Sequence, residues 1–422
     1  MLRALKELIR AFIPSLILSK LLSAYHFTLA ALAAAAFGYP SRFLLVIGVT
    51  GTKGKTTVTE MVNAILEEAG HTTALINSIR FKIGAKSERN ITRMSMPGRL
   101  FIQKLLTSAV HSRCTAVVLE MTSEGARQHR HRFIDMNALI FTNLAPEHIE
   151  SHGSYEAYRD AKFEIGKQLV RSGKRPRIIV ANADDKESSR YLTLPVEHAL
   201  PFSLSQGNAS ADQNGGSFEF EGTRITLSLP GAFSLRNALA AATLARALGI
   251  APTVIARALE KIKKIPGRAE RIEMGQDFAV VVDYAHTPDS LSALYDAYRN
   301  VRKICVLSAT GGGRDTWKRP IMGRIAEEKC AEVVLTNEDP YDEDPQQIVE
   351  DIAHGMNKRP VIIMDRREAI RAALKKAHTD DVVLITGKGT DPSICGPGGS
   401  SILWSDAQVA RDELEHLLRT ET

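Results

Sequence analysis

A glycine-rich loop at residues 48–57 restricts the fold of this chain more than any other feature. The loop reads GVTGTKGKTT, and it lies between an apolar run at 44–49 and a helical pattern at 56–69. A strand, a glycine loop and a helix in this order bind phosphate, because backbone N–H groups and the helix N-terminus point at the anion. The strict pattern has glycine where this chain has Val49, so the loop is a variant that bends at Gly51. The sequence thus predicts a nucleotide-binding α/β domain.

The side chains of this loop suit a nucleoside triphosphate bound with Mg²⁺. Lys55 can neutralise β- and γ-phosphate oxygens, and the Thr56 hydroxyl is a typical Mg²⁺ ligand. We therefore expect ATP and Mg²⁺ as the ligands of the loop. The residues predicted to contact the nucleotide here are Gly51, Thr52, Lys53, Gly54, Lys55, Thr56 and Thr57.

Two further segments place polar side chains at the ends of predicted strands. Glu120 ends the run 116–120, where a carboxylate lies at the mouth of a parallel sheet and can reach a cation held by Thr56. Residues 141–153, FTNLAPEHIESHG, follow another strand and carry two histidines and two carboxylates. By themselves these residues suit either a solvated polar loop or a metal and phosphate shell. The neighbouring phosphate loop favours the second alternative.

Short β-branched runs alternate with helical segments in the first part of the chain. Such alternation predicts a parallel sheet that helices cover on both faces. Residues 208–229 follow a different, alternating pattern after two glycines, which predicts a small antiparallel insertion. The strands are expected at 44–49, 116–120, 138–142 and 177–182, with helices at 56–69, 155–170 and 235–248.

Pro266 and Gly267 mark a predicted domain boundary. Beyond it, five apolar runs are each followed by a helical stretch, which predicts a doubly wound, Rossmann-like α/β sheet. These strands are expected at 278–282, 303–307, 332–336, 361–364 and 382–386. The expected organisation is an apolar helical leader at 1–42, a central ATP-binding domain at 43–266 and a C-terminal domain at 267–422.

Length and composition agree with a folded protein of several domains. At about 150 residues per domain, 422 residues correspond to roughly three domains. The net charge of +6 includes no concentrated basic run, so nucleic acid is not an expected partner. The cysteines form no C-x-x-C pair, which argues against a zinc cluster or a disulfide framework and favours reduced thiols in a cytoplasm. They are Cys114, Cys305, Cys330 and Cys395.

The first forty residues are basic at the start and then almost wholly apolar. Three structures compete for this segment: a cleaved export signal, a helix at a membrane surface, and a helix packed on the following domain. Export conflicts with the nucleotide loop, which needs cytosolic ATP. The stretch 21–40 is long enough to span a bilayer, but its polar residues and its many alanines favour a packed helix. Membrane-surface contact through residues 1–40 stays open, because Pro14 breaks the first helix and basic residues flank it.

Several of these motifs together resemble the Mur ligase family, from about residue 43 to the end of the chain. The shared motifs are GTKGKTT at 51–57, EMTS at 120–123, FTNL at 141–144 with His148, the His-Gly pair at 152–153, and PGR at 266–268. Others resemble the UDP-N-acetylmuramoyl-tripeptide synthetase type of the family, namely DYAHTPD at 283–289, GGRD at 312–315, KRP at 318–320 and GKG at 387–389. The resemblance to folylpolyglutamate and cyanophycin synthetases is weaker.

The resemblance implies an ADP-forming ligase that joins an amino acid to a peptide carboxylate. In this chemistry the carboxylate attacks the γ-phosphate of ATP, and the amine then displaces phosphate from the acyl phosphate. By similarity, Thr56 and Glu120 hold one Mg²⁺, while His148 and Lys162, the latter as a carbamate, support a second. The implied catalytic residues are Lys55, Glu120, His148 and Lys162. The implied setting is peptidoglycan synthesis, in the cytoplasm or at the inner face of the membrane.

The same resemblance assigns residues to the nucleotide and to two substrates, an amino acid and a (UDP-)muramoyl-peptide-like acceptor. The nucleotide positions are Asn143, Asn237, Arg268, Asp283 and His286, and the substrate positions are Ser123, Gln128, Arg130, Arg314, Asp339, Gly387 and Asp391. The family's Asp-Asn-Pro-Arg motif reads EDPY at 338–341 here, so the arginine for the distal carboxylate of diaminopimelate is missing. We expect diaminopimelate to be a poor substrate, and lysine stays an open alternative.

Two other functions stay open at the level of sequence. One is ligation onto a different carboxylate, such as a folate or a polyamide, because forty helical residues stand where the family has a UDP-gripping domain. The other is a switch or scaffold that hydrolyses ATP without ligation. The presence of Glu120, His148 and Lys162 together disfavours the switch.

Overall fold

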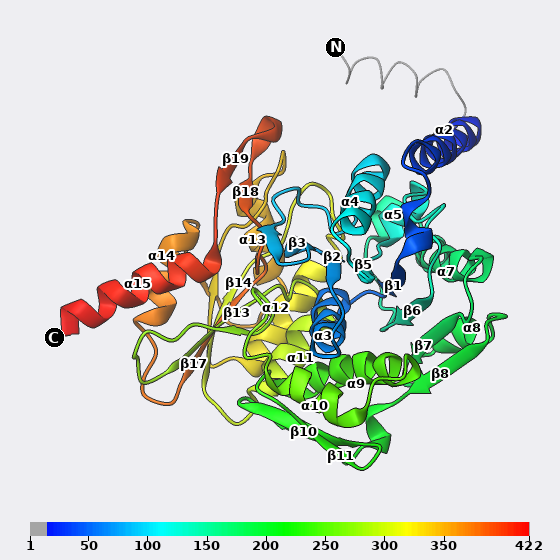
Figure 1. Cartoon of the computed structure of the whole chain (residues 1–422). Coiled ribbons are helices and arrows are strands. Elements are labelled where there is room, and N and C mark those ends of the chain that lie inside the picture. The colour runs from blue at the N-terminus through cyan, green and yellow to red at the C-terminus, as the bar shows by residue number, and fades with distance from the viewer. Residues whose placement is uncertain (1–14, 422) are drawn as a thin grey trace.

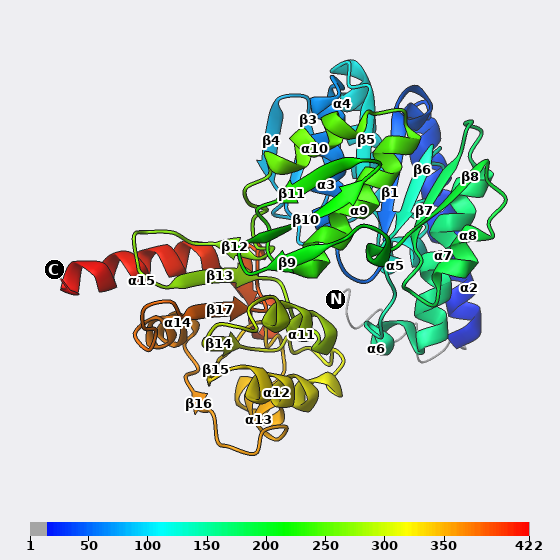
Figure 2. The same ribbon diagram turned by 90° about the horizontal axis from the view of Figure 1, so that it is seen from below.

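The computed structural model describes residues 15–421, and it contains two α/β units that each surround one large sheet (Figures 1 and 2). The basic residues Arg3, Lys6 and Arg10, and the predicted break at Pro14, lie outside the described residues. The predicted fold class, a parallel sheet with a phosphate loop followed by a doubly wound α/β sheet, is confirmed.

The larger sheet has eight strands in the order β4-β3-β2-β5-β1-β6-β7-β8. These are β1 (Leu45–Thr50), β2 (Thr73–Ile76), β3 (Arg80–Ile83), β4 (Lys86–Arg89), β5 (Ala116–Glu120), β6 (Ala138–Phe141), β7 (Ile178–Asn182) and β8 (His198–Phe202). The strands from β2 across to β8 pair in parallel, and β1, β5, β6 and β7 among them are the strands that the sequence predicted. At the other edge β3 and β4 form an antiparallel hairpin, which corrects the expectation of a wholly parallel sheet. The four residues of β4 are polar and exposed, so they give no apolar signal.

Helices cover both faces of the larger sheet. One face packs against α3 (Lys55–Glu68), α9 (Gly231–Ala247) and α10 (Pro252–Glu260). The other packs against α4 (Arg99–His111), the short α5 (Ser123–Arg127) and α7 (Tyr155–Arg171). Successive residues of β1 alternate between these two cores, with Ile47 in the first and Val46 in the second. The smaller helices of this unit are α6 (Ile149–His152), α8 (Ser188–Leu192) and the 3₁₀ helices η1 (Pro40–Phe43) and η2 (Leu204–Gln206).

The predicted insertion is confirmed as a three-stranded antiparallel sheet in the order β11-β10-β9. Its strands are β9 (Ser210–Asp212), β10 (Gly215–Phe220) and β11 (Thr223–Leu227). The alternating residues Phe218, Ile225 and Leu227 join the core that α9 and α10 share with the larger sheet. The insertion therefore extends the nucleotide-binding unit instead of forming a separate body.

The second unit is a six-stranded sheet in the order β12-β13-β17-β14-β15-β16. Its strands are β12 (Glu270–Arg271), β13 (Ala279–Asp283), β14 (Lys303–Leu307), β15 (Glu332–Leu335), β16 (Val361–Ile362) and β17 (Val382–Thr386). One face packs on α11 (Pro288–Ala297), α12 (Lys318–Lys329) and α13 (Pro345–Ala353), and the other on α14 (Arg366–Leu374) and α15 (Asp406–Glu421). A hairpin of β18 (Ser393–Cys395) and β19 (Ser401–Leu403), with the 3₁₀ helix η3 (Pro397–Gly399) between its strands, extends from this unit.

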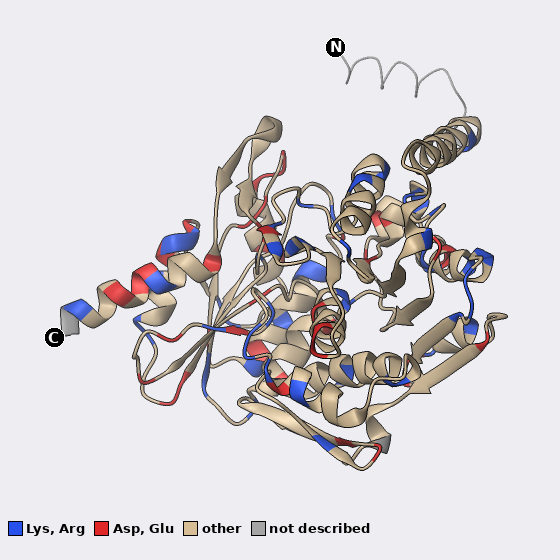
Figure 3. Cartoon of the chain, viewed as in Figure 1, with Lys and Arg blue, Asp and Glu red and all other residues tan. Residues whose placement is uncertain are grey.

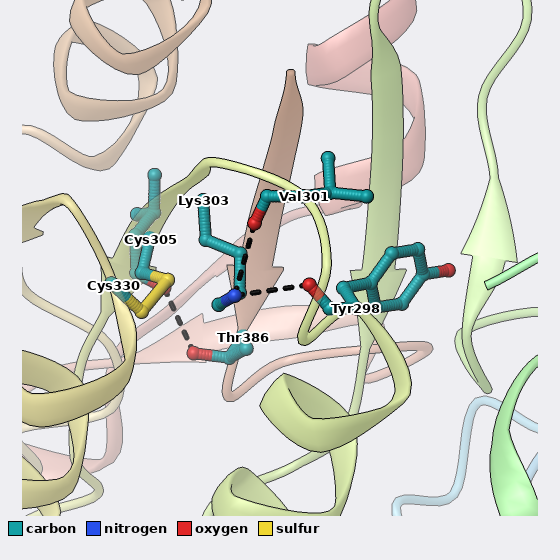
Figure 4. The surroundings of a disulfide bond; sticks show 7 residues. Tyr298, Val301, Lys303, Cys305, Cys330 and Thr386 are labelled. Atoms are coloured by element: carbon teal, nitrogen blue, oxygen red, sulfur yellow. Dashed lines mark hydrogen bonds between the residues drawn. A yellow bond between two sulfur atoms is a disulfide. The ribbon is translucent and has the colours of Figure 1, made fainter. Parts of the chain in front are cut away.

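The expectation that all four cysteines are reduced thiols is wrong for one pair. Cys305 on β14 and Cys330 at the end of α12 form a disulfide, with their Cα atoms 6.2 Å apart (Figure 4). The chain returns from α12 directly into β15, the strand beside β14, and this brings the two residues together although they lie 25 positions apart. Cys114 and Cys395 are free and buried.

The leader contains one long helix, α2 (Ser15–Ala36), which lies beside α4 (Figure 1). Ala30, Ala33 and Ala34 are buried, so the helix packs on the domain through an alanine-rich face. Most of the other side chains of the helix are exposed or partly exposed to solvent. By length and composition this segment could cross a membrane, and Lys20 is its single charged residue, which leaves it almost uniformly tan in Figure 3.

Candidate active site

The phosphate loop joins β1 to α3 in a conformation that two glycines make possible. Gly51 and Gly54 have φ of 143° and 83°, a region that disfavours residues with a side chain. A Cβ atom on Gly51 would stand 2.0 Å from the Thr142 hydroxyl, and one on Gly54 would stand 2.3 Å from the Asn237 side-chain oxygen. Gly54 also caps α3, so the N-terminus of this helix opens directly on the loop.

Two lysine ammonium groups meet at one carbonyl of the loop. Lys162 on α7 donates from Nζ to the Gly51 carbonyl oxygen at 2.7 Å, and Lys55 donates to the same oxygen at 3.1 Å and to that of Thr52 at 3.0 Å. Burial lowers the pKa of Lys55, and burial together with the Lys55 charge holds the pKa of Lys162 well below its usual value. Lys162 is only 2% exposed and therefore has a stronger tendency to be a neutral amine than a surface lysine.

Thr56 and Glu120 are in direct contact, as their places at the sheet edge predict. The Thr56 hydroxyl donates to Glu120 Oε2 at 2.9 Å, and Ser78, after β2, donates its backbone N–H to the same oxygen at 3.1 Å. Arg268 reaches from the second unit and donates to the hydroxyls of Thr56 and Ser78 at 3.3 and 3.2 Å. Within residues 15–421, buried Glu120 forms no ion pair with a lysine or arginine, so a hydroxyl and an unpaired carboxylate are available as oxygen ligands. This donor set fits Mg²⁺.

The histidine loop 141–153 lies against the phosphate loop and the second unit. His148 has a left-handed backbone, and Asp315 accepts hydrogen bonds from the backbone N–H groups of His148 and Ile149 at 2.7 and 3.0 Å. The His148 ring centroid lies 6.1 Å from that of Tyr158, whose hydroxyl is 2.9 Å from the Thr52 hydroxyl. Burial, opposed by Glu147, lowers the pKa of His148 to about 4. The imidazole is thus neutral at pH 7, the form that binds a metal.

Glu147 links the two units beside the loop. It accepts from Lys53 Nζ at 3.0 Å and contacts His286 Nε2 at 2.8 Å. Burial acts to raise the pKa of Glu147, but the Lys53 charge and the His286 contact outweigh it and hold this pKa well below its usual value. The structure therefore places His286 against an ionised carboxylate beside Lys53.

The other predicted nucleotide residues brace the backbone around the loop. Asn143 accepts from the Lys53 N–H at 2.9 Å and donates to the Lys53 carbonyl at 3.1 Å. Asn237 lies against Gly54 from α9. Asp283, at the end of β13, accepts from the N–H groups of Ala269 and Ala285 at 2.6 and 2.7 Å, and burial raises its pKa. Asn143 and Asn237 thus contact the phosphate loop, and Asp283 holds the backbone on both sides of β13 in the second unit.

The predicted acceptor residues follow Glu120 along α5. Ser123 is buried at the start of this helix, and Gln128 follows its last turn. Arg130 donates to the Gln128 side-chain oxygen at 2.7 Å and also to the Met96 carbonyl. The predicted amino-acid residues form a separate group in the second unit.

In that second group, Lys388 lies between two carboxylates. Its Nζ is 2.7 Å from Asp339 and 3.4 Å from Asp391. Gly387 has φ of 108°, and a Cβ atom there would stand 2.3 Å from a Glu338 carboxylate oxygen. Arg314 stacks on the Tyr341 ring, with its central carbon 5.1 Å from the ring centroid.

Two residues near these groups have no counterpart in the sequence prediction. Ser78 completes the Thr56 and Glu120 contact, and its position directly after β2, beside β5, was the available signal. Arg93, in the loop after β4, donates to the Tyr341 hydroxyl at 2.9 Å, contacts Cys395 Sγ and lies 3.8 Å from Asp339. Only the folded chain brings Arg93 to the second unit, since it precedes Tyr341 by 248 positions.

Fold and site together define a two-unit α/β nucleotide enzyme with a phosphate loop and a Mg²⁺-type donor set at its centre. Residues 49–245 match the Mur ligase middle domain, and residues 267–389 match the Mur ligase glutamate ligase domain. The chain belongs to the Mur ligase family and is an ATP-dependent ligase.

Two relatives indicate which branch of the family is similar. The UDP-N-acetylmuramoyl-L-alanyl-D-glutamate–2,6-diaminopimelate ligase of Syntrophomonas wolfei is 38% identical over 378 residues, which cover 86% of this chain and 76% of that protein. The UDP-N-acetylmuramyl-tripeptide synthetase of Roseiflexus sp. is 36% identical over 418 residues, 92% of this chain and 82% of that protein.

Solved structures agree with the fold. A UDP-N-acetylmuramoyl-L-alanyl-D-glutamate–2,6-diaminopimelate ligase structure is 27% identical and has a TM-score of 0.60, covering 89% of this chain and 79% of that chain. The folylpolyglutamate synthase of Mycobacterium tuberculosis, in its ADP complex, has a TM-score of 0.68 at 18% identity, covering 86% and 91%. The second likeness shows the shared fold alone.

Proposed function

We propose that this ligase adds an amino acid to the peptide carboxylate of a UDP-muramoyl peptide during peptidoglycan synthesis, in the cytoplasm where Mur ligases act. The observation that carries the proposal is the convergence of Lys55, Lys162 and the Thr56–Glu120 pair on one phosphate loop. The names of the Syntrophomonas and Roseiflexus relatives support the acceptor. The acceptor carboxylate would attack the ATP γ-phosphate, and the incoming amine would then displace phosphate from the acyl phosphate.

We infer two places for Mg²⁺ in this arrangement. Thr56 and Glu120 would hold one ion, and His148 with carbamylated Lys162 would hold another. A neutral Lys162 amine can form an N–C bond to CO₂ and release a proton, which converts the neutral amine into an anionic carbamate beside Lys55. When bound, the ions supply positive charge that offsets the charge on the transferred phosphoryl group. Lys55 would neutralise the same oxygens.

We assign the other predicted residues to the nucleotide, the acceptor or the amino acid according to where they lie relative to the phosphate loop. Asn143, Asn237, Arg268, Asp283 and His286 would bind or brace the nucleotide. Ser123, Gln128 and Arg130 would contact the acceptor, which then runs along α5. The amino acid would bind in the second unit, near Arg314, Asp339, Gly387 and Asp391.

The test of this function is release of phosphate from ATP with and without the two substrates. A ligase releases phosphate only when UDP-muramoyl dipeptide and an accepted amino acid are both present. We expect diaminopimelate to be used poorly in an amino-acid panel, because Tyr341 replaces the arginine that would pair with its distal carboxylate. Phosphate release that ignores both substrates would contradict ligation, and efficient turnover with diaminopimelate alone would contradict the substrate prediction.

We also propose that α2 holds the enzyme at the inner face of the membrane. Its outer face carries large apolar side chains that no other element covers: Ile17, Leu21, Leu22, Tyr25 and Leu32 are all about half exposed or more, with Leu21 at 55% and Tyr25 at 57%. Moving these exposed apolar side chains from water to the acyl boundary of a bilayer is favourable in proportion to the apolar area removed from water. The buried alanine face keeps α2 attached to the enzyme at the same time.

Vesicle sedimentation tests the membrane proposal. The full chain should sediment with phosphatidylglycerol vesicles, and replacing Leu21, Leu22 and Tyr25 with serine should reduce the bound fraction roughly 10-fold or more. Replacing Ile402 and Leu403, which are also exposed but lie on β19, is the matched control and should leave sedimentation unchanged. Equal sedimentation of the chain and its α2 variant would exclude α2 as the contact.

A further inference from the structure

Two arginines meet where α2, α4 and α5 come together, outside the ATP site. Arg99 is the first residue of α4, and its Nη2 lies 2.7 Å from Nδ1 of His26 on α2 and 3.3 Å from the Gln128 carbonyl oxygen. Arg130 donates to the side-chain oxygen of the same Gln128 at 2.7 Å. Gln128 thus holds both guanidinium groups in one place.

Carboxylates do not balance this positive charge. Within residues 15–421, neither arginine forms an ion pair; the nearest acid along α5, Glu124, accepts from Gln128 Nε2 at 2.7 Å and lies 3.7 Å from Arg127. Nε of Arg99 is buried and has no hydrogen-bond partner. Burial lowers the pKa of the Arg130 guanidinium, Glu124 opposes this effect, and the Arg99 charge adds to it. Paired guanidiniums with unused donors bind phosphate and carboxylate groups strongly.

The arginine pair lies at the opposite end of α5 from Glu120, which belongs to the candidate active site. Glu120 ends β5, the buried Ser123 begins α5, and Gln128 follows the last turn of this helix. Five helical residues span about 7.5 Å, so a ligand whose carboxyl group reacts beside Glu120 can reach Arg99 with its other end. α2 closes the far side, because Ser23 bonds to His129 at 2.8 Å and Phe27 packs on Phe133 with ring centroids 5.3 Å apart.

We propose that Arg99 and Arg130, with Arg99 oriented by His26, bind the diphosphate of the acceptor between α2 and α5. The inference rests on the proposed function, which supplies an acceptor with a carboxylate at one end and a diphosphate toward the other. Two guanidinium groups match the charge of a diphosphate better than that of a single peptide carboxylate. A nucleotide and a lipid carrier both present this diphosphate.

Acceptor kinetics test the assignment. With UDP-muramoyl dipeptide, Arg99→Ala should raise the KM for the acceptor about 10- to 100-fold and leave the KM for ATP unchanged. With muramoyl dipeptide that lacks the diphosphate, the variant and the parent enzyme should have the same KM. Lys104→Ala, on the exposed face of the same helix, is the matched control. An unchanged KM for the diphosphate acceptor, or an equal rise for both acceptors, overturns the proposal.

A binding measurement separates this proposal from the proposed function. With the phosphate loop filled by a non-hydrolysable ATP analogue, calorimetric titration with UDP should give binding to the parent chain and a loss of about 10-fold or more in Arg99→Ala. This result supports the arginine site even if no amino acid is ligated, and equal binding by both proteins overturns it. The kinetic assay with a polyprenyl-diphosphate-linked acceptor in micelles identifies which molecule carries the diphosphate. Use of the nucleotide form indicates a soluble acceptor. Use of the micellar form alone indicates a lipid-linked acceptor.

Discussion

Replacing Lys162 with alanine is expected to lower kcat by about 10²- to 10³-fold, the usual effect of removing one preorganised charged group from an active site. The side chain is buried and donates to the Gly51 carbonyl, so its loss removes a charged or chargeable group from beside Lys55 and the phosphate loop. If Lys162 acts as a carbamate, acetate or formate at high concentration should restore part of the activity, because the small acid can occupy the space of the missing carboxylate. ATP binding should stay close to that of the parent chain.

The control for this experiment lies on the same helix. Lys167 is a half-exposed lysine on α7 that pairs with Glu164, so Lys167→Ala should keep full activity. Because burial and Lys55 lower the pKa of Lys162, the neutral amine is available at lower pH than for a surface lysine, and activity that depends on the carbamate should persist toward neutral pH. Full activity of Lys162→Ala without an added acid would remove Lys162 from the site.

The phosphate loop could be predicted from sequence because its signal is local. The residues from Gly51 to Thr57 form one contiguous motif between a strand and a helix, and β5 begins and ends at the predicted residues 116 and 120. The contact between Thr56 and Glu120 also follows from sequence, since the carboxyl ends of neighbouring parallel strands meet at one sheet edge. Short motifs and strand ends are therefore enough to define the centre of the candidate site.

The sequence could not predict contacts between residues that are far apart in the chain and come together only in the fold. Ser78 follows β2, a strand of four residues that the apolar pattern did not separate from its surroundings. Arg93 reaches Tyr341 only because the polar hairpin of β3 and β4 brings its loop to the second unit. The disulfide of Cys305 and Cys330 has the same origin, because its cysteines come together through the order of β14 and β15 and have no spacing motif.

The leader shows a different limit of sequence reasoning. The composition of residues 15–36 predicted a helix but did not determine which face of that helix would pack on the nucleotide-binding unit. In the fold, Ser23, His26 and Phe27 contact α4 and the segment that follows α5, on the side of the buried alanines and at the spacing of a helical stripe. The large apolar residues lie on the other side. One helix can therefore pack on the domain through one face and contact a membrane through the other. At the level of sequence, these two were alternatives.

Glu120→Gln should lower kcat by about 10²-fold or more and make the remaining activity nearly independent of Mg²⁺ concentration. The amide has the size of the carboxylate and can still accept from the Thr56 hydroxyl and the Ser78 N–H, so the fold is expected to persist. What it lacks is the negative charge that a divalent cation requires. Since Glu120 forms no ion pair with a lysine or arginine in the described part of the chain, this charge is available to the ion.

Nucleotide binding in the presence and absence of Mg²⁺ tests this reasoning directly. In EDTA, ADP should bind Glu120→Gln and the parent chain with similar affinity, because the proposed phosphate contacts, the loop N–H groups and Lys55, are the same in both. Adding Mg²⁺ should tighten binding to the parent chain alone. Glu124→Gln, a half-exposed acid on α5, is the matched control and should respond to Mg²⁺ like the parent chain. A normal Mg²⁺ response in Glu120→Gln would mean that the ion binds elsewhere, and the contact between Thr56 and Glu120 would then serve only to position the loop.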